Sequence, residues 1–239
     1  MRTLDAAVVV PTRNRHSLLL DLLSSLRHLD PVPAEVVVVD DASASPVTSP
    51  VISADYPFHL KVLRNQLCIG PGASRNRGVH HSRSSIILFT DDDCIVKPGW
   101  ASALVDAIKR GSESLGGVGG RVLARDRDIY SRYYEFHRIL EPRPHNAANP
   151  DAIPYLVTAN CAMTREWFMR AGGFDERLPD AGGEDAALSM RIARLGGHFL
   201  RTDGAVVHHR FRRGLVDFAR TFYRYGLGGR YVVDRYLPV

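Results

Sequence analysis

The chain has 239 residues, of which 45% are hydrophobic and 24% are charged. These proportions are ordinary for a globular protein with a full core, and they exclude bulk disorder and fibrous repeats. The net charge is +5, and residues 201–239 carry all of it, with eight arginines against three aspartates. A basic stretch of this kind suits anionic ligands or an acidic membrane surface.

No stretch approaches the roughly 20 apolar residues that span a bilayer. The densest apolar cluster near the start, 6–10, ends at Pro11 and is too short for a signal peptide. We therefore expect a cytoplasmic protein. Cys68, Cys94 and Cys161 are odd in number and widely spaced, which predicts reduced thiols rather than a disulfide framework or a metal cluster.

The first half of the chain alternates strand and helix patterns. Apolar, β-branched runs predict strands at 7–10, 35–39, 59–63 and 86–89. Leucine spacing and proline–glycine starts predict helices at 13–28 and 72–80, and a third helix after Pro98-Gly99. Continuous apolar strands separated by helices favour a parallel sheet that is covered on both faces.

The second half is less regular. It predicts a flexible glycine run at 116–120, strands at 121–123 and 206–209, and helices at 130–140, 184–195 and 215–225. Residues 141–154 contain four prolines and little apolar content, which indicates a surface loop that could act as a lid. With no internal repeat and no long linker, residues 1–239 are predicted to form a single α/β domain.

Polar groups follow three of the predicted strands: Thr12 with Arg13, Asp40 with Asp41, and Asp91 to Asp93. Ligands of an open parallel sheet bind beyond the carboxyl ends of its strands. Three consecutive carboxylates repel one another, and a divalent cation would offset that cost. Asp91 and Asp93 would point to the same side if the segment stays extended. The alternative is an exposed acidic turn.

A nucleotide site could lie at the glycine-rich start of the helix that follows Gly70. The amino end of this helix could receive an anion, and Arg75 or Arg77 could pair with phosphate. The segment matches neither a dinucleotide-binding fingerprint nor a P-loop. A glycine-capped surface helix is the alternative.

Two further pairs of residues could serve an acceptor and a metal. Glu184 and Asp185 follow two glycines at a helix start, where the helix dipole favours carboxylates and where a general base could also stand. His208 and His209 end a predicted strand. Because successive side chains of a strand point to opposite faces, only one of the two histidines could face a metal.

Taken together, six segments resemble the family 2 glycosyltransferases, which have the GT-A fold. They are Val8 to Asn14, Val39 to Ser43, Gly72 to Gly78, Phe89 to Asp93 with Pro98-Gly99-Trp100, Gly172 to Glu176, and Gly183-Glu184-Asp185. The segments stand in the family's order over roughly residues 6 to 210. The resemblance implies a nucleotide-sugar-binding half (1–100), an acceptor half (101–210) and a basic aromatic carboxyl-terminal segment (211–239).

The resemblance also implies residue roles. The expected nucleotide-binding residues are Pro11, Thr12, Arg13, Asp40, Asp41, Arg75, Asp91 and Asp92. Asp91 and Asp93 match the DxD positions that hold the metal, Mn²⁺ or Mg²⁺, with His209 as the favoured third ligand and His208 as the second candidate. Asp185 matches the catalytic base, and Glu184 beside it is expected to shape the acceptor site.

The implied reaction is the inverting transfer of a sugar from a nucleoside diphosphate to an acceptor hydroxyl. UDP is the favoured nucleotide, with GDP and dTDP as alternatives. The acceptor could be a saccharide, a lipid-linked molecule or a small molecule. The chain lacks the long carboxyl-terminal membrane segments and the QxxRW-like motif of processive synthases, so a polymerase is not expected.

Two other functions compete with this one. A sugar-nucleotide pyrophosphorylase would show a glycine-rich signature after the first strand, where Pro11-Thr12-Arg13-Asn14 stands instead. A non-catalytic nucleotide-binding module would not need both the acidic triplet and Asp185. Nucleic acid is not an expected partner, because the body of the chain is neutral. The basic carboxyl-terminal segment could contact the inner face of a membrane peripherally, or could simply form a solvated helix.

Overall fold

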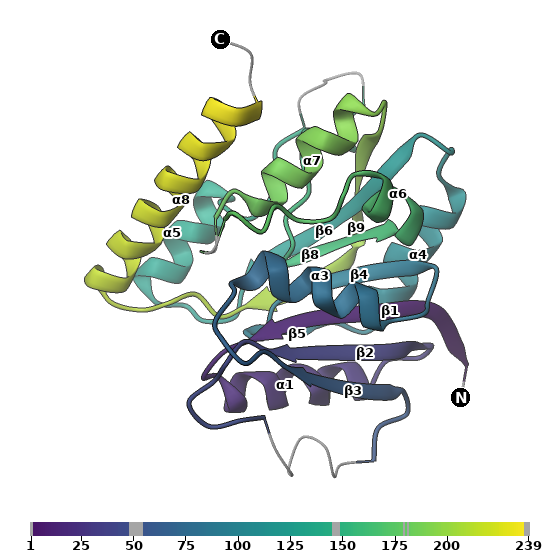
Figure 1. Cartoon of the computed structure of the whole chain (residues 1–239), viewed down its shortest axis with the longest axis horizontal. Helices are drawn as coiled ribbons and strands as arrows, with labels where there is room; N and C mark the ends of the chain where they lie inside the picture. The colour runs from purple at the N-terminus through teal and green to yellow at the C-terminus, as the bar shows by residue number, and fades with distance from the viewer. Residues whose placement is uncertain (1, 48–54, 145–148, 179, 181, 237–239) are drawn as a thin grey trace.

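The computed structural model describes residues 2–47, 55–144, 149–178, 180 and 182–236 (Figure 1). Its strands are β1 (Thr3–Thr12), β2 (Val32–Asp40), β3 (His59–Arg64), β4 (Ile86–Thr90), β5 (Cys94–Val96), β6 (Leu115–Ala124), β7 (Ala152–Ile153), β8 (Asn160–Thr164) and β9 (His198–His209). Its helices are α1 (His16–Arg27), α3 (Pro71–His81), α4 (Trp100–Arg110), α5 (Ile129–His137), α6 (Arg165–Arg170), α7 (Glu184–Arg194) and α8 (Leu215–Tyr236).

A single mixed sheet runs through both halves of the described chain, with the strand order β3-β2-β1-β4-β8-β6-β9-β5 and β7 paired to β9. The four strands of the first half are parallel to one another, as the sequence predicts. In the second half, β8 runs antiparallel to both β4 and β6, and β5 runs antiparallel to β9. The parallel strands β1, β2 and β4 therefore end at one common edge.

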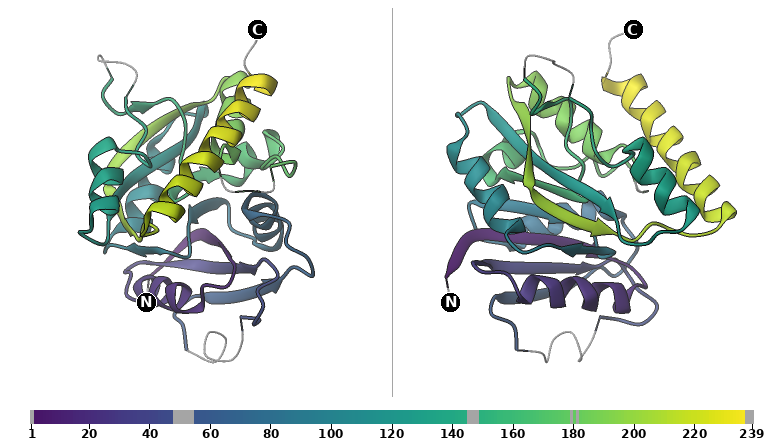
Figure 2. Two further views of the ribbon diagram at one scale, coloured as in Figure 1. Left: turned by 90° about the vertical axis from the view of Figure 1, so that its left-hand side faces the viewer. Right: turned by 180° about the vertical axis from the view of Figure 1, so that it is seen from behind.

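Alternating side chains of β1 divide the core into two layers. Val8 and Val10 pack in one cluster with the buried leucines of α1 and with Trp100 of α4. Ala7 and Val9 pack in the other cluster with residues of α3, α6 and α7. Figures 1 and 2 show α3 on one face of the sheet and α1 on the opposite face. Each fully buried leucine of α1 contributes roughly 1.5–3 kcal/mol relative to leaving it exposed.

The glycine run at 116–120 is not a flexible segment, because it lies inside β6 and is buried. A Cβ atom on Gly117 would lie 2.5 Å from the Leu156 side chain, and one on Gly120 would lie 2.4 Å from the Ala205 carbonyl oxygen. The glycines are therefore needed for close packing between β6 and its neighbours. The predicted strand at 121–123 is only the end of this ten-residue strand.

The proline-rich stretch at 141–154 is partly anchored. Glu141 is buried and accepts a hydrogen bond from the Val122 amide at 2.9 Å, and Ala152–Ile153 pair with β9. Residues 145–148 lie outside the described residues, so the lid that we predict for this stretch stays a prediction.

Helix α8 is 22 residues long, twice the predicted 215–225. Its first half packs Phe218 and Phe222 against Tyr133 and Tyr134 of α5. Leu215, the first residue of α8, is apolar but 70% exposed.

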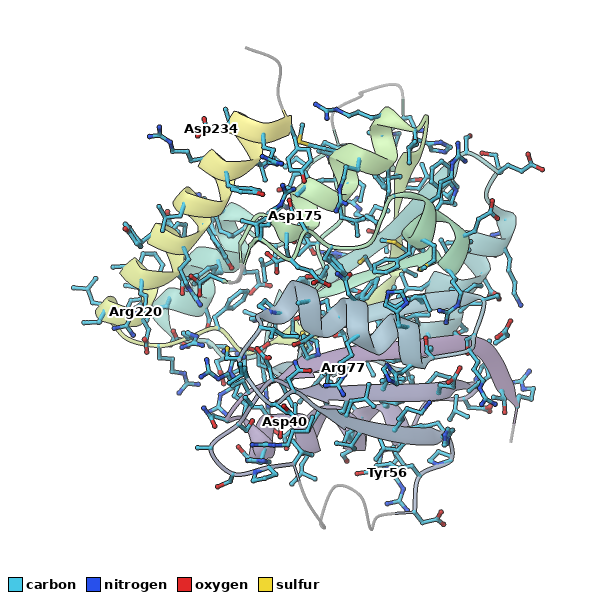
Figure 3. All side chains as sticks on the ribbon, viewed as in Figure 1. Asp40, Tyr56, Arg77, Asp175, Arg220 and Asp234 are labelled. Carbon is cyan, nitrogen blue, oxygen red and sulfur yellow. The ribbon has the colours of Figure 1, made fainter. Side chains whose placement is uncertain are left out.

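The second half of α8 is fixed to the segment before α7. Tyr231 and Tyr236 both donate hydrogen bonds to the carboxylate of Asp175, at 3.0 and 2.8 Å. The position of Asp175 is labelled in Figure 3. The Arg177 guanidinium lowers the pKa of Asp175 well below its usual range, and the two hydroxyls add to this effect. The charged carboxylate therefore anchors α8 across the acceptor half.

Candidate active site

A cleft of about 820 Å³ opens at the common edge where β1, β2 and β4 end. That volume suits a nucleotide sugar, since small-molecule sites usually span roughly 300–1,000 Å³. The cleft is lined by the segments that follow β1, β2 and β4, by the starts of α3 and α7, by the end of β9, and by α8. The predicted residues Pro11, Thr12 and Arg13 are all among its lining residues.

Two of the three adjacent carboxylates share one arginine. Arg15 donates to Asp92 at 2.9 Å and to Asp93 at 2.7 Å, and the Thr12 hydroxyl donates to Asp92 at 2.7 Å. Burial, reinforced by the negative charge of Asp93, raises the pKa of Asp92 to about 7. Burial disfavours the charge of Arg15, but the two carboxylates outweigh it and raise the pKa of Arg15. Sequence reasoning missed Arg15, which is separated from its partners by more than 75 residues of chain.

The third carboxylate, Asp91, points toward a different arginine. Asp91 accepts a hydrogen bond from Arg75 at 2.6 Å, and the same guanidinium donates to Glu184 at 3.2 Å. Arg75 is only 3% exposed, so both ion pairs are buried on its side. The segment is a turn, closed by the Cys94 amide on the Asp91 carbonyl, and not the extended stretch that would align Asp91 with Asp93. Arg75 thus connects the acidic turn to the start of α7.

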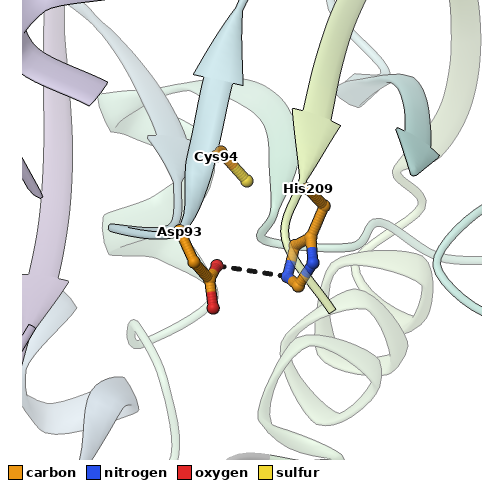
Figure 4. Close-up of side chains that lie close together, drawn as sticks. All are labelled: Asp93, Cys94 and His209. Carbon is orange, nitrogen blue, oxygen red and sulfur yellow. Dashed lines mark ion pairs between the residues drawn. The ribbon is translucent and has the colours of Figure 1, made fainter. Parts of the chain in front are cut away.

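The end of β9 places His209 beside Asp93. Asp93 Oδ1 is buried, lies 3.2 Å from His209 Nε2, and has no hydrogen-bond partner among the described residues (Figure 4). Cys94 is also near, but burial raises the pKa of its thiol well above the usual value, and Sγ faces the Ala159 carbonyl. A carboxylate oxygen and an imidazole nitrogen in close approach fit a divalent cation such as Mn²⁺ or Mg²⁺.

His208 does not line this cleft. It pairs with Ile95 in the β5–β9 ladder, one position from the Cys94–His209 pair, so its side chain points to the opposite face of the sheet. Burial and the nearby Lys97 charge lower the pKa of His208. Of the two candidate histidines, the structure therefore places His209 at the acidic turn.

The carboxylates of Glu184 and Asp185 differ in how firmly they are held. Glu184 is buried, and it accepts from Arg75 and from the Gly182 amide, the latter at 2.7 Å. Asp185 lines the cleft and accepts from the Ala186 amide at 2.8 Å. Burial, together with the charge of Glu184, raises the pKa of Asp185 to about 7. A carboxylate with a pKa near neutrality is suited to accept a proton.

The two aspartates after β2 are both engaged in loop structure. Asp40 accepts from the amides of Ser43 and Val47 at 2.9 and 3.1 Å, and it does not line the cleft. Asp41 lines the cleft and accepts from the amides of Ile69 and Gly70 at 2.9 and 3.0 Å. Asp41 therefore shapes the loop that precedes α3.

Helix α8 closes the side of the cleft next to Asp185. Its residues Thr221, Arg224, Tyr225 and Gly229 line the cleft. The contact is close because residue 228 is glycine: a Cβ atom there would lie 1.9 Å from the Gly182 carbonyl oxygen. None of these α8 positions was among the candidate site residues from the sequence.

Four arginines of the basic carboxyl-terminal segment, at 212, 213, 220 and 224, differ in their surroundings. Arg213 pairs with Asp126 and Asp128, and Arg220 pairs with Asp217. The other two, at 212 and 224, line the cleft. Peripheral membrane contact stays a prediction. No helix of the described residues is both long and apolar enough to cross a membrane.

Comparison with known families agrees with this geometry. A model of "Glycosyl transferase family 2" matches residues 7–172, and a model described as "N-terminal domain of galactosyltransferase" matches residues 146–212. The chain belongs to glycosyl transferase family 2. This confirms the family predicted from the sequence, and similarity to solved structures confirms the GT-A fold.

Relatives of this family 2 chain include the pre-mycofactocin glycosyltransferase of Mycobacterium tuberculosis. The two are 30% identical over 218 residues, which cover 90% of the chain and 44% of the relative. A solved mannosyltransferase from Pyrobaculum calidifontis, in complex with GDP-Man and Mn²⁺, is 23% identical with a TM-score of 0.71, covering 95% of the chain and 64% of that protein. GalNAc-T7 with UDP, GalNAc and Mn²⁺ is 20% identical with a TM-score of 0.70, covering 87% and 43%. The chain spans less than half the length of the first curated relatives that it matches.

Proposed function

We propose that this chain is a metal-dependent, inverting glycosyltransferase that moves a sugar from a nucleoside diphosphate to an acceptor hydroxyl. One observation carries the proposal: a buried carboxylate–imidazole pair, Asp93 with His209, and a proton-accepting carboxylate, Asp185, line the same cleft of a family 2 chain. Asp93 and His209 could hold a cation at the diphosphate leaving group, and Asp185 could accept the proton of the acceptor hydroxyl.

On the donor side, Asp93 and His209 would hold the divalent cation, with Asp91 at the rim of the same turn. The cation would neutralise the charge that develops on the diphosphate as it leaves. Arg15 keeps Asp92 and Asp93 in place through its two ion pairs. The segment 11–13 and Asp41 line the part of the cleft where the nucleoside would lie.

On the acceptor side, Asp185 takes the proton of the attacking hydroxyl. The acceptor oxygen forms its bond to the anomeric carbon while the bond from that carbon to the diphosphate oxygen breaks. Because the attacking and leaving oxygens occupy opposite faces of the sugar, the anomeric configuration inverts. A general base of this kind contributes roughly 10²–10⁴-fold to the rate.

Glu184 and Arg75 position the two sides relative to each other. The Arg75 guanidinium, buried between Asp91 and Glu184, ties the acidic turn to the start of α7. Removing only one partner of these buried ion pairs would leave an uncompensated charge, which typically costs about 3–5 kcal/mol. Arg75 is therefore assigned a positioning role.

UDP remains the first candidate for the donor nucleotide. Mn²⁺ accompanies UDP in the GalNAc-T7 structure and GDP-Man in the mannosyltransferase structure, and these neighbours support a nucleotide–metal pair without selecting the base. A pyrophosphorylase activity is disfavoured by family membership. The sugar and the acceptor hydroxyl are open to a screen.

Calorimetric titration of UDP, GDP and dTDP, each with and without Mn²⁺, tests the proposal. We expect one of the nucleotides to bind at least tenfold more tightly with the metal. Proton NMR of the product formed from the matching sugar nucleotide would then give the anomeric configuration. Metal-independent binding, or a product that retains the donor configuration, would contradict the proposed reaction.

A further inference from the structure

Three arginines of the cleft, Arg13, Arg212 and Arg224, form no ion pair with a described residue, and Arg13 lies in the segment assigned to the nucleoside. Arg15 and Arg75 each bind two carboxylates. Arg212 and Arg224 line the same cleft, yet neither forms an ion pair with any described residue. The residues that the structure does not describe include no aspartate or glutamate. In addition, Arg224 Nε is buried and has no hydrogen-bond partner among the described residues.

Arg224 stands on the acceptor side of the cleft. It belongs to the face of α8 that contacts the loop before α7: a Cβ atom on Gly182 would lie 3.1 Å from the Arg224 carbonyl oxygen and 3.2 Å from the Tyr225 ring. Asp185 lies only three residues after Gly182 in the sequence. Tyr225 lines the same cleft as Asp185, and burial raises the pKa of the Tyr225 hydroxyl.

Arg212 and Arg224 carry positive charge without an ion-pair partner among the described residues. Partial burial lowers the pKa of Arg212, the guanidinium groups of Arg15 and Arg224 lower it further, and the charges of Asp217 and Asp93 offset this repulsion only in part. Arg15 already binds two carboxylates, whereas Arg212 and Arg224 bind none. A bound oxyanion would remove both the repulsion and the unmet hydrogen-bonding capacity of Arg224, because a guanidinium fork matches phosphate and carboxylate geometry.

We propose that the acceptor is an anionic molecule, and that Arg224 binds its phosphate or carboxylate group while Asp185 faces its hydroxyl. This inference rests on the proposed function, and it names the substrate class of the same site. Arg212, which lines the same cleft, adds positive potential for the acceptor anion. Aromatic residues of the cleft, including the stacked pair Tyr134 and Phe211, offer an apolar wall for the body of the acceptor.

The test uses the whole chain saturated with UDP and Mg²⁺, so that the donor phosphate site is filled. Methyl phosphate and acetate are titrated as separate probes by calorimetry into wild type, Arg224→Gln and Arg220→Gln. Arg220 is the matched control, because it lies on the same helix, pairs only with Asp217 and is outside the cleft. Thermal melting verifies that each variant is folded.

We expect at least one probe to bind wild type and Arg220→Gln equally, and to bind Arg224→Gln about tenfold or more weakly, as the loss of a charged hydrogen bond implies. UDP affinity should agree within twofold across all three proteins. The inference is overturned if neither probe binds wild type, if the probe affinity is unchanged in Arg224→Gln, or if that variant loses UDP affinity and so assigns Arg224 to the donor. Wild type that binds no nucleoside diphosphate contradicts the proposed function instead, and titration of the nucleotide-free protein then still tests Arg224.

Discussion

Replacing Asp185 by Asn should reduce catalysis and raise stability at the same time. Burial and the neighbouring charge of Glu184 raise the pKa of Asp185 from 3.8 to about 7. The ionised carboxylate that the reaction requires is therefore the less favourable form in the folded protein. Asn keeps an oxygen for the Ala186 amide hydrogen bond and carries no charge.

The sign of the pH dependence follows from the direction of this shift. The folded protein holds the Asp185 proton more tightly than the unfolded chain, so the stabilisation is complete below pH 4 and is lost as the pH rises to about 7. A shift of this size corresponds to at most roughly 4 kcal/mol. Since Asp185 is partly exposed to the cleft, we expect about 2 kcal/mol, which raises the melting temperature of Asp185→Asn at pH 8 by about 4–8 °C.

Activity should move in the opposite direction. Wild-type kcat/KM should fall about tenfold per pH unit below pH 7, because the base becomes protonated. Asp185→Asn should turn over roughly 10²–10⁴-fold more slowly and should lose this acid limb. The reaction is followed by release of the nucleoside diphosphate between pH 5.5 and pH 8.5.

Calorimetric melting at pH 4.5 and pH 8 completes the test, with Asp106→Asn as the control. Asp106 is exposed, forms no ion pair with a described residue and lies outside the cleft, so its replacement should change neither property. The reasoning fails if Asp185→Asn is less stable than wild type at pH 8 while its turnover stays near normal. Near-normal turnover alone would move the base to another group.

Three further substitutions, two of them with a matched control variant, test other parts of the site. Asp93→Ala should lower Mn²⁺-dependent UDP affinity by about tenfold or more, measured by calorimetry, and leave any metal-independent binding unchanged. His209→Ala should also lower this affinity, whereas the control His208→Ala should not, because only the His209 side chain faces the acidic turn. Gly228→Ala should lower stability by about 1–3 kcal/mol, since its Cβ would meet a carbonyl oxygen at 1.9 Å. Gly226→Ala, with open space around its Cβ, should be neutral or stabilising by up to about 1 kcal/mol in the same melting assay.

The first half of the fold was predictable because its signals are local. Each buried parallel strand is a continuous apolar run, such as Val36 to Val39, and the leucines of α1 repeat at helical spacing. The second half gives weaker signals. Strand β8 reads Asn-Cys-Ala-Met-Thr, without a β-branched apolar run, and forms because it lies between β4 and β6. Tertiary pairing, rather than intrinsic propensity, decides that strand.

Glycine-containing segments were predicted incorrectly at two places. In β6 the glycine-rich run 116–120 predicts flexibility, but its four glycines are needed because neighbouring segments of the same chain approach too closely for a side chain. The predicted helix 215–225 ends just before Gly226, yet α8 continues through the glycines at 226, 228 and 229 to Tyr236. Gly228 allows contact with the loop before α7, and the hydrogen bonds of Tyr231 and Tyr236 to Asp175 hold the last turns. Both causes depend on residues that are distant along the chain.

Candidate chemistry was easier to predict than its pairing. The motifs at Asp91 to Asp93 and at Asp185 identify carboxylates that line one cleft. Which arginine holds each carboxylate depends on the turn after β4 and on the register of α1, and no spacing rule gives either. For Arg75, the structure adds two buried ion pairs, with Asp91 and Glu184, that the sequence did not predict, while its expected contact with the nucleotide stays a prediction.

The charge balance of the cleft explains why a cation should be required for the donor to bind. Five carboxylates line it at the acidic turn and the start of α7, namely Asp91, Asp92, Asp93, Glu184 and Asp185. Four of them pair with Arg15 or Arg75, and Asp185 forms no ion pair with a described residue. The cleft also contains the unpaired arginines 13, 212 and 224, so the excess of negative charge that a diphosphate would meet is local to the acidic turn and the start of α7. Burial and this excess of negative charge raise the pKa of Asp92 and of Asp185 to about 7, because a bound proton removes one of the negative charges. A divalent cation between Asp93 and His209 would lower this excess too and would leave Asp185 free to ionise. Protons and the metal therefore both reduce the same excess of negative charge. Donor affinity should weaken at low pH, where protons replace the cation.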